Sequence, residues 1–443
     1  MRETLVKAEE FKDSLVGRIP KDWDVSSLAA LTPYITYGFT NPMPTTKDGP
    51  WMITAFDIAN GKICYGQARH TSEKAYKNDL TQKSKPNLGD ILITKDGTLG
   101  RIAVVDRTGI CINQSVACLR PLLDTDVRFL VHYLRSDIGQ ERMLADAGGS
   151  TIKHIYITKL AQMEVPVPPR EERTRISDIL DTIDSAIAHT SSLIAKLKQM
   201  KAGLLHDLLT RGLDENGELR DAIAHPEQFK DSPLGRIPKD WLVVSVGECL
   251  ARIEQGWSPD CESNNTPLGE WGVLKTTAVV WEGYQDFENK QLPSHLQPDP
   301  NYEVKPGDVL MTRAGPNSRV GVVALVRQTQ GKLMLSDKLY RLIPRDYVKP
   351  DFLAYTLSGN QTQGHLSTLK TGLAESQTNI SQEIVRTLLI ALPKIQEQER
   401  IISILDTHDS HIRTEEAYRD KLKLQKQGLM HDLLTGMIRV KDT

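Results

Sequence analysis

The sequence predicts an α+β protein with a pseudo-twofold duplicated dumbbell architecture, in which two similar globules are joined by a pair of long antiparallel coiled-coil helices. Three observations support this prediction. The chain contains a near-identical internal repeat, each half has a long stretch that reads as short strands and turns, and each half ends in a helical stretch of about forty residues.

The internal repeat indicates that the whole unit is duplicated. Residues 11–23 read FKDSLVGRIPKDW and residues 229–241 read FKDSPLGRIPKDW, which agree at 11 of 13 positions with an offset of 218. A second block, RISDILDTID at 175–184 against RIISILDTHD at 400–409, has an offset of 225 and extends to GLLHDLLT at 203–210 against GLMHDLLT at 428–435. A period near 220 residues is too long for a solenoid, so it indicates a duplicated domain with its connector.

Each globule is predicted to contain both strands and helices. Residues 24–165 and 242–390 carry short runs of Val, Ile, Thr and Tyr separated by Gly, Pro, Asn and Asp, which is typical of strands and turns. We expect strands at 91–94, 102–105, 309–312 and 320–326. Shorter helices are expected at 127–134 and 350–357, so each globule is α+β.

The long helices are predicted to begin after prolines at 166–169 and 393, because proline stops a strand and favours a helix start. In the first helix, residues 171–209, eight of ten a and d positions are apolar, which predicts a coiled-coil seam. The ten positions are Ile176, Ile179, Ile183, Ala186, Thr190, Leu193, Leu197, Met200, Leu204 and Asp207. In the copy, residues 396–434, the stripe contains Ile401, Leu405, Ile412, Leu422, Leu429 and Leu433, and His408 and His411 interrupt it.

The order of the repeated blocks predicts how the chain closes. In the second half the FKDS…W block follows a long helix, but at the start of the chain no helix precedes it. Joining the two ends would complete a cyclic repeat, so we expect the second helix to run back to the first globule, antiparallel to the first helix. The predicted domains are residues 1–165 and 213–392 for the two globules, and residues 166–212 and 393–443 for the two helices.

Composition excludes several classes of protein. Lys and Arg number 55 against 57 Asp and Glu, which excludes a histone-like binder and leaves only local basic clusters for nucleic acid. No apolar run approaches the roughly 20 residues of a membrane span, and residues 1–14 are too charged for a secretory signal, so we expect a cytoplasmic protein. The five cysteines form no C-x-x-C pair, so we expect reduced and mostly buried thiols with no zinc site.

The order of motifs resembles the specificity subunit of type I restriction-modification systems, over essentially the full chain. A predicted globule is followed by V-P-x-P-P, by I-x-x-I-L-D and by a long helix that ends in L-x-H-D-L-L-T. Next comes G-x-I-P-x-x-W, after which the whole pattern occurs again. Gly89-Asp-Ile-Leu92, Gly307-Asp-Val-Leu310 and Ser376-Gln-Thr-Asn-Ile-Ser381 also resemble signatures of that family. The first half has Gly148-Gly-Ser-Thr-Ile-Lys153 where the second has the fuller Ser376–Ser381 form.

The resemblance implies two target recognition domains, each of which reads one half of an interrupted double-stranded DNA sequence. It implies that the helices hold these domains apart and dock two modification (methyltransferase) subunits, with restriction/translocase subunits as further partners and no membrane. The chain itself would be non-catalytic and would hold no cofactor or metal. Adenine-N6 methylation with S-adenosylmethionine, and cleavage driven by ATP with Mg, would belong to the partner chains.

Candidate DNA-binding residues lie in loops beside the predicted strands, where Arg, Lys, Asn, Gln, Ser and Thr can pair with base edges and phosphates. In the first globule they are Lys95, Thr98 and Arg101, then Asn113, Gln114 and Ser115, then Ser150, Thr151 and Lys153. In the second they are Arg313, Asn317, Ser318 and Arg319, then Ser336 and Lys338, then Gln377 and Asn379. For each residue, a solvated turn or a cap is the alternative.

Two aromatic turns also correspond between the halves. Tyr37-Gly38-Phe39-Thr40 matches Gly256-Trp257-Ser258-Pro259, and such an aromatic could pack on a sugar or close the core. We favour the core.

Catalytic motifs are absent from the sequence. It contains no G-x-x-x-x-G-K-[ST], no H-E-x-x-H, no G-x-S-x-G and no Asn/Asp-Pro-Pro-aromatic segment. His206-Asp207 and His431-Asp432 could pair as a base with its carboxylate, but their place near a helix C-terminus favours a structural role. Glu171-Glu172 and Glu415-Glu416 are expected to be solvated helix faces.

Two other functions compete with DNA recognition. A self-contained methyltransferase or nuclease would methylate or cut DNA as the purified chain alone, and the missing motifs argue against it. A helical scaffold whose globules bind protein would give no sequence-dependent DNA protection even with its partners present.

Overall fold

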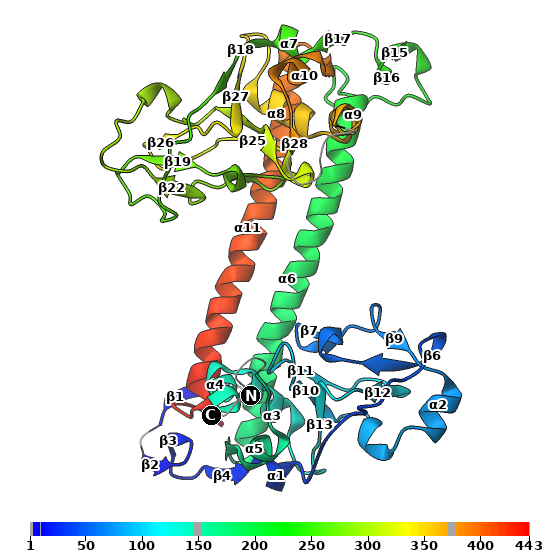
Figure 1. Cartoon of the computed structure of the whole chain (residues 1–443), viewed down its shortest axis with the longest axis vertical. Coiled ribbons are helices and arrows are strands. Elements are labelled where there is room, and N and C mark those ends of the chain that lie inside the picture. Colours follow the sequence, from blue (N-terminus) through cyan, green and yellow to red (C-terminus); the bar gives the residue numbers. More distant parts are fainter. Residues whose placement is uncertain (1–2, 9, 146–152, 371–377, 443) are drawn as a thin grey trace. The chain divides into compact units, whose positions relative to one another are not determined.

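The computed structural model describes residues 3–8, 10–145, 153–370 and 378–442 and consists of two compact units. The first unit comprises Met1–Ser192 and Glu416–Thr443, and the second comprises Leu193–Glu415. Both units mix helices and strands, which confirms the α+β class (Figure 1). Because residues 416–443 belong to the first unit, the second long helix does return to the first globule, as the cyclic order of the repeat predicts.

The globule of the first unit contains short elements up to the first long helix. They are β1 (Glu3–Lys7), β2 (Phe11–Ser14), β3 (Gly17–Pro20), β4 (Asp24–Ser27), α1 (Leu28–Leu31), β5 (Tyr34–Tyr37), β6 (Thr46–Ile53), η1 (Ala55–Asp57), β7 (Ile58–Ala59), β8 (Lys62–Ile63), β9 (Arg69–His70), α2 (Glu73–Asn78), η2 (Gln82–Ser84), β10 (Ile91–Thr94), β11 (Ile102–Val104), β12 (Ile110–Ile112), β13 (Val116–Arg120), α3 (Val127–Arg135), α4 (Asp137–Ala145), α5 (Ile157–Gln162) and β14 (Glu164–Val167).

The globule of the second unit has a similar series. It contains η3 (Pro226–Gln228), β15 (Phe229–Ser232), β16 (Gly235–Pro238), β17 (Leu242–Ser245), α7 (Val246–Cys249), β18 (Leu250–Gln255), β19 (Gly272–Leu274), η4 (Thr276–Ala278), β20 (Val279–Val280), β21 (Gly283–Tyr284), β22 (Asn289–Gln291), η5 (Pro300–Tyr302), β23 (Val309–Thr312), β24 (Ala314–Gly315), η6 (Asn317–Arg319), β25 (Val323–Leu325), β26 (Leu333–Met334), β27 (Leu339–Pro344), α8 (Pro350–Ser358), α9 (Asn360–Leu369), β28 (Thr378–Asn379), α10 (Gln382–Thr387) and β29 (Leu389–Leu392).

The core of the first unit is built on a four-stranded antiparallel sheet with strand order β11-β10-β13-β5. Side chains of β10 alternate between two apolar clusters, with Ile91 and Ile93 in one and Leu92 in the other. This alternation follows from the two-residue period of a strand. Because apolar side chains cover both faces, β10 reads as a continuous apolar run in the sequence.

The second unit repeats this topology. Its four-stranded sheet has the order β25-β23-β27-β18, and Val309 and Met311 of β23 enter one cluster while Leu310 enters the other. The three-stranded sheets also match, since β12-β6-β9 and β26-β19-β22 each contain one parallel pair. The strand predicted at 320–326 is shorter than expected, because Gly321 has φ +90° and β25 begins only at Val323.

The two long helices are unbroken. α6 spans Arg170–Thr210 and α11 spans Ile395–Leu434, with 41 and 40 residues (Figure 1). At 1.5 Å per residue each is about 60 Å long. Within the first unit Asp184 of α6 pairs with Lys426, and the earlier Glu172 pairs with the later Arg439. Residue numbers therefore rise along α6 in the direction in which they fall along the returning segment. The two helices are therefore antiparallel there, as predicted.

The buried stripe of α6 confirms the predicted a positions of the seam and corrects the predicted d positions. The a positions are buried or half-buried as expected, but the d positions lie one residue later, at Leu180, Ile187, Ile194, Lys201 and Leu208. Leu193 is 41% exposed and Met200 59% exposed, whereas Ile194 is 4% exposed. Residues three and four apart lie on the same helix face, and apolar neighbours at 179–180, 186–187 and 193–194 fit both registers. The sequence pattern alone therefore could not separate them.

The stripe predicted for α11 is confirmed. Ile401, Leu405, Ile412, Leu422 and Leu433 are all buried, and Leu429 is half-buried. Of the two interrupting histidines, His408 lies half-buried in the stripe. The side chain of His411 is 56% exposed, so this residue does not interrupt the seam.

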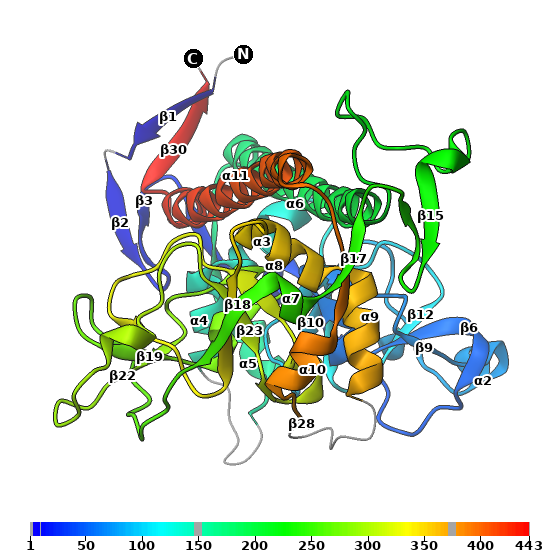
Figure 2. The same cartoon turned by 90° about the horizontal axis from the view of Figure 1, so that it is seen from above.

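The two ends of the chain pair with each other. β1 and β30 (Ile438–Asp442) form an antiparallel two-stranded sheet from Glu3↔Asp442 to Lys7↔Ile438, and the two strands lie side by side in Figure 2. This pairing closes the cyclic repeat that the order of blocks predicts.

A buried glutamate ties each repeated block to the start of a long helix. The indole Nε1 of Trp23 donates to Glu172 at 3.0 Å, and that of Trp241 donates to Glu397 at 3.1 Å. Glu172 is only 5% exposed, so the expectation of a solvated face is wrong for Glu172, but it is confirmed for Glu171, whose side chain is 85% exposed. The side chain of Glu415 is also mostly covered, at 21% exposure, because this position belongs to the seam of α11.

The cysteines match the sequence prediction. All five are free, and Cys111, Cys118 and Cys249 are buried. Burial raises the pKa of the Cys111 thiol to about 12 and that of Cys249 to about 11, so both are protonated and unreactive near neutral pH. Within the described ranges, none of the helices has the length and apolar character of a membrane span.

Candidate nucleic-acid interface

Three segments meet where β10 ends. The N–H of Lys95 donates to the carbonyl oxygen of Ser115 at 2.9 Å, and the carbonyl oxygen of Lys95 accepts from the N–H of Ile155 at 3.0 Å. These bonds join the end of β10, the turn between β12 and β13, and the segment that precedes α5. The structure therefore brings together three loops that the sequence analysis chose separately.

The second unit builds the same junction where β23 ends. The N–H of Arg313 donates to the carbonyl oxygen of Lys338 at 2.9 Å, and the carbonyl oxygen of Arg313 accepts from the N–H of Ile380 at 2.9 Å. Lys95 and Arg313 thus occupy the same backbone position in the two units. We call these two places the first and the second strand-end junction.

Side chains at the first junction form an ionic cluster around Asp96. Lys95 Nζ lies 2.8 Å from Asp96 Oδ2, and His154 Nδ1 lies 2.5 Å from Asp96 Oδ1. Burial alone would raise the pKa of Asp96, but hydrogen bonds from Lys95 and His154 lower it below its ordinary value. Lys95 also lies 5.5 Å from the ring centre of Tyr37. The junction therefore presents a carboxylate held between two nitrogen donors.

The second junction has an arginine in place of this cluster. Arg313 donates through Nη2 to Asn379 Oδ1 at 2.8 Å and through Nη1 to the carbonyl oxygen of Asp337 at 3.2 Å. Its guanidinium lies 5.4 Å from the ring centre of Tyr340. Burial would raise the pKa of Asp337, but hydrogen bonds with Ser258 and Lys338 lower it. One backbone frame thus carries different chemistry in the two units.

The remaining predicted residues divide into exposed and structural groups. Eight have exposed side chains beside the junctions, namely Thr98, Arg101, Gln114, Lys153, Ser318, Arg319, Lys338 and Asn379. Asn113 and Ser115 hold their own turn, since Asn113 Oδ1 accepts from Ser115 Oγ at 2.6 Å and Ser115 Oγ accepts from the N–H of Ala55 at 3.0 Å. Ser336 is 3% exposed, so its hydroxyl does not reach the surface. Asn317 is half-buried. Ser150, Thr151 and Gln377 lie outside the described residues.

Sequence reasoning missed Asp96, His154 and Asp337. Their positions directly beside Lys95, Lys153 and Lys338 were visible, but acidic residues and histidine were not expected at a surface meant for DNA. An acidic side chain can accept a hydrogen bond from a cytosine amino group, so an aspartate there is compatible with base reading.

The two aromatic turns fix the loop beside each junction. The N–H of Phe39 donates to the carbonyl oxygen of Ile112 at 3.0 Å, and that of Trp257 to Leu335 at 3.1 Å. A Cβ on Gly38 or Gly256 would lie within 2 Å of those carbonyl oxygens, so only glycine permits this approach. Phe39 packs on a buried cluster as predicted, but Trp257 is 36% exposed and so does not close the core.

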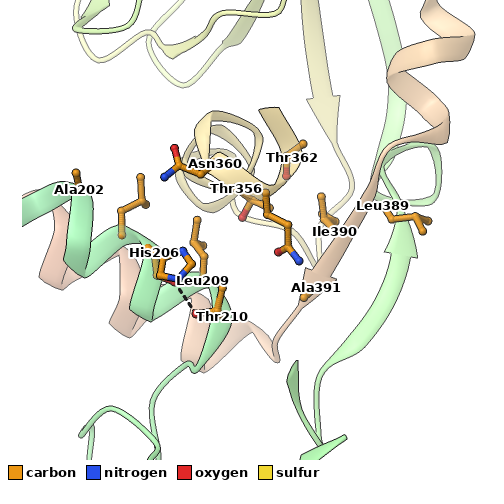
Figure 3. Close-up of a pocket in the computed structure, with 13 residues that line it drawn as sticks. Ala202, His206, Leu209, Thr210, Thr356, Asn360, Thr362, Leu389, Ile390 and Ala391 are labelled. Atoms are coloured by element: carbon orange, nitrogen blue, oxygen red, sulfur yellow. Dashed lines mark hydrogen bonds between the residues drawn. The ribbon is translucent and has the colours of Figure 1, made fainter. Parts of the chain in front are cut away.

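A small pocket of about 70 Å³ lies between α6 and α9 in the second unit, lined in part by His206 (Figure 3). The carbonyl oxygen of His206 accepts from Thr210 Oγ1 at 2.8 Å, and the carboxylate of Asp207 lies 3.7 Å from Arg211. No acidic side chain of the described residues lines this pocket, so none of them gives the imidazole a carboxylate partner there. The arrangement favours the structural interpretation of His206-Asp207.

Across the described parts of the chain, no three His, Cys, Asp or Glu side chains come together as a possible metal site.

Comparison with known proteins agrees with the duplicated fold. The family model for the type I restriction modification DNA specificity domain matches residues 20–199 and again residues 238–424. The EcoEI type I restriction enzyme specificity subunit of Escherichia coli is 36% identical over 249 residues, which are 55% of this chain and 40% of that protein. The putative MjaX type I specificity subunit of Methanocaldococcus jannaschii is 25% identical over 98% of both chains.

Two solved structures have the same fold. The S subunit of a type I restriction-modification system from M. genitalium covers 95% of this chain and 96% of its own, with 17% identity and a TM-score of 0.55. A chain from a structure that addresses complex assembly and conformational transition of the type I R-M system gives 20% identity and a TM-score of 0.55. Because the two matches to the family model together span most of the sequence, the chain belongs to the type I restriction-modification DNA specificity family.

Proposed function

We propose that this chain is the DNA recognition subunit of a type I restriction-modification complex, in which each unit reads one half of a bipartite DNA site. The observation that supports this most directly is the pair of strand-end junctions. They share backbone hydrogen bonds but carry an Asp96 cluster in one unit and Arg313 with Asn379 in the other. Two readers of different base sequence need a common frame with different side chains.

The side chains at the two junctions suit different base edges. An arginine can donate two hydrogen bonds to guanine, and an aspartate can accept from the amino group of cytosine. The exposed residues beside them, such as Arg101, Lys153, Arg319 and Lys338, suit the phosphate backbone. The two half-sites should therefore differ in sequence.

The long helices would set the distance between the half-sites and dock two modification subunits. The chain's net charge of -2 favours weak DNA binding by the chain alone, because affinity for duplex DNA depends on phosphate neutralisation. Partner subunits would add contacts and would carry adenine-N6 methylation with S-adenosylmethionine, and cleavage by restriction/translocase subunits with ATP and Mg. The complex would act in the cytoplasm, where the DNA is.

Mapping of adenine methylation over the genome, with and without this gene, tests the proposal. A bipartite methylated motif that disappears when the gene is deleted supports it. Unchanged methylation together with DNA methylation by the purified chain alone would point to the self-contained enzyme instead.

A further inference from the structure

A second, larger pocket lies in the second unit beside the second strand-end junction. Its volume is about 660 Å³, and its walls come from η6, from α9 and the residue after it, and from the turn between β20 and β21. Trp281 in that turn is 55% exposed. The pocket is therefore open to solvent and has an aromatic side chain at its edge.

Lys370 is a buried cation in the wall of this pocket. The residue is 9% exposed, and its Nζ donates to the carbonyl oxygens of Val320 at 2.8 Å and Asn317 at 3.5 Å. Both acceptors are neutral, and in the part of the chain that the structure describes no carboxylate lies within ion-pair distance of Nζ. Burial lowers the pKa of Lys370, with no opposing contribution from a nearby anion. A buried charge whose hydrogen-bond acceptors are all neutral is costly, and an anion that enters the pocket would reduce that cost.

The other residues of the wall are compatible with an anion. Among the described residues, none of those that line the pocket is acidic. Asn317 Oδ1 is buried without a hydrogen-bond partner, and the hydroxyl of Ser318 is exposed. Because the oxygen and nitrogen of an amide are assigned by their surroundings, Asn317 can offer either atom to a ligand. The wall therefore combines a cation, an amide and a hydroxyl.

The aromatic edge of this pocket differs between the two units. The hairpin β7–β8 matches β20–β21, which places Asn60 where the second unit has Trp281. The corresponding position of the first unit therefore carries an amide side chain in place of the indole.

We propose that this pocket binds one phosphate group of the DNA backbone beside the second half-site, with Lys370 on a phosphate oxygen and Trp281 against the adjoining sugar. The inference rests on the proposed function, since it assigns a contact of the same recognition unit. The proposed binding site lies outside the strand-end junction. Lys370 contributes to the affinity for DNA and not to the choice of bases.

The test measures binding of the full chain, together with the proteins that co-purify with it, to a duplex that contains the methylated motif. Lys370→Gln removes the charge, Lys370→Arg keeps it, and Lys305→Gln removes an exposed charge of the same unit away from the pocket. We expect Lys370→Gln to weaken binding roughly tenfold and to reduce the slope of log K against log salt by about 0.9, the value for one phosphate contact. Lys370→Arg should restore most of the slope, and Lys305→Gln should leave it unchanged.

Two further measurements separate the alternatives. Trp281→Ala should weaken binding without a change in the salt slope. Melting of the unliganded Lys370→Gln protein should occur at the wild-type temperature or above it, because a lone buried charge is removed. A lower melting temperature with unchanged DNA binding would mean that Lys370 only supports η6, and would overturn the proposal.

Inorganic phosphate alone serves as the last probe. If phosphate raises the melting temperature of the wild type but not of Lys370→Gln, while both bind DNA equally, the pocket takes a free anion and the DNA assignment is wrong. If the wild type binds the motif and Lys370→Gln binds it with the same affinity and slope, this inference fails and the proposed function stands. A wild-type complex without preference for the motif would contradict the proposed function itself.

Discussion

Lys426 on α11 forms an ion pair with Asp184 on α6, with 2.6 Å between Nζ and Oδ1. In the second unit Lys201 on α6 pairs with Asp409 on α11 at 2.5 Å. The repeat offset of 225 residues relates Asp184 to Asp409 and Lys201 to Lys426, so each ion pair is the counterpart of the other. The helices α6 and α11 therefore align in the same antiparallel register in both units. One lysine–aspartate pair in each unit defines this register.

This register can be tested by a double-mutant cycle. Lys426→Met and Asp184→Asn should each lower the free energy of unfolding by about 1 kcal/mol, with a coupling of about 0.5–1 kcal/mol, because both side chains are partly covered. Lys423→Met is the control, since the Lys423 side chain is more exposed and pairs with Asp420 on its own helix. Urea denaturation measures all four proteins. A coupling near zero would show that the pair does not hold the helices in register.

The carboxylate of Glu172 should be essential for the closure of the chain ends. It accepts from Arg439 Nε and Nη2 at 2.7 Å each, and from the N–H of Val440 at 3.2 Å. Glu172→Ala removes the buried partner of Arg439 and of the Trp23 indole, while Arg439 keeps its ion pair with Asp22 at 2.7 Å, so we expect a loss of about 2–3 kcal/mol. Hydrogen exchange should then rise in β1 and β30. Glu171→Ala is the matched control, because the Glu171 side chain is 85% exposed. Equal exchange in the two variants would contradict this role.

Stability of the first unit should depend on pH through His132. Burial lowers the pKa of His132, and the hydrogen bond with Asp181 at 2.8 Å only partly offsets this. Its Nδ1 is buried without a partner, so a second ring proton would have no acceptor. The unfolded chain, with a histidine pKa near 6.5, binds this proton more readily than the folded protein. The contribution of neutral His132 to the free energy of unfolding is therefore complete above about pH 6.5. It is lost as the pH falls below that value, by at most about 1.4 kcal/mol per pH unit.

Thermal melting at a series of pH values checks this dependence. His132→Gln should flatten the decline below pH 6.5, and His189→Gln, an exposed position of α6, should not. An equally steep decline in His132→Gln would assign the effect to other groups.

The lengths of the helices should set the spacer of the DNA site. Four residues inserted after Ser192 in α6 and four after Ala417 in α11 extend both helices by about 6 Å at corresponding positions. Since B-form DNA rises about 3.4 Å per base pair, the methylated motif should keep its halves and gain one or two base pairs between them. Insertion in α6 alone should instead destabilise the protein, because the two lysine–aspartate pairs cannot then share one register. Methylation at the original spacing by the doubly extended protein would show that the helices do not set the distance.

The fold was largely predictable because its strongest signals are local. A buried strand such as Ile91–Thr94 and a helix of 41 residues leave clear apolar patterns, and the repeat itself predicted the topology. The seam of α6 was only half right, because Leu193 and Ile194 fit the pattern equally and their exposure depends on the partner helix. The burial of Glu172 was missed for a related reason, since its partners Trp23 and Arg439 are remote in sequence.

The candidate site was less predictable than the fold. Residue type pointed to loops that the structure brings together at each strand end, but it could not reveal that Ser336 is buried or that the Asn113 side chain bonds within its own turn. The pairing of Asp96 with His154 depends on segments 58 residues apart, which no local pattern connects. Lys370 carries no motif at all, and only its burial distinguishes it from other lysines.

The claim that each unit reads its own half-site is tested most directly by exchange of one globule. Residues 24–165 would be replaced by the corresponding globule of a relative with a different motif, and adenine methylation would be mapped over the genome. The account predicts a motif in which one half changes to that of the relative while the other half and the spacer stay the same. An unchanged motif, or a change in both halves, would contradict it.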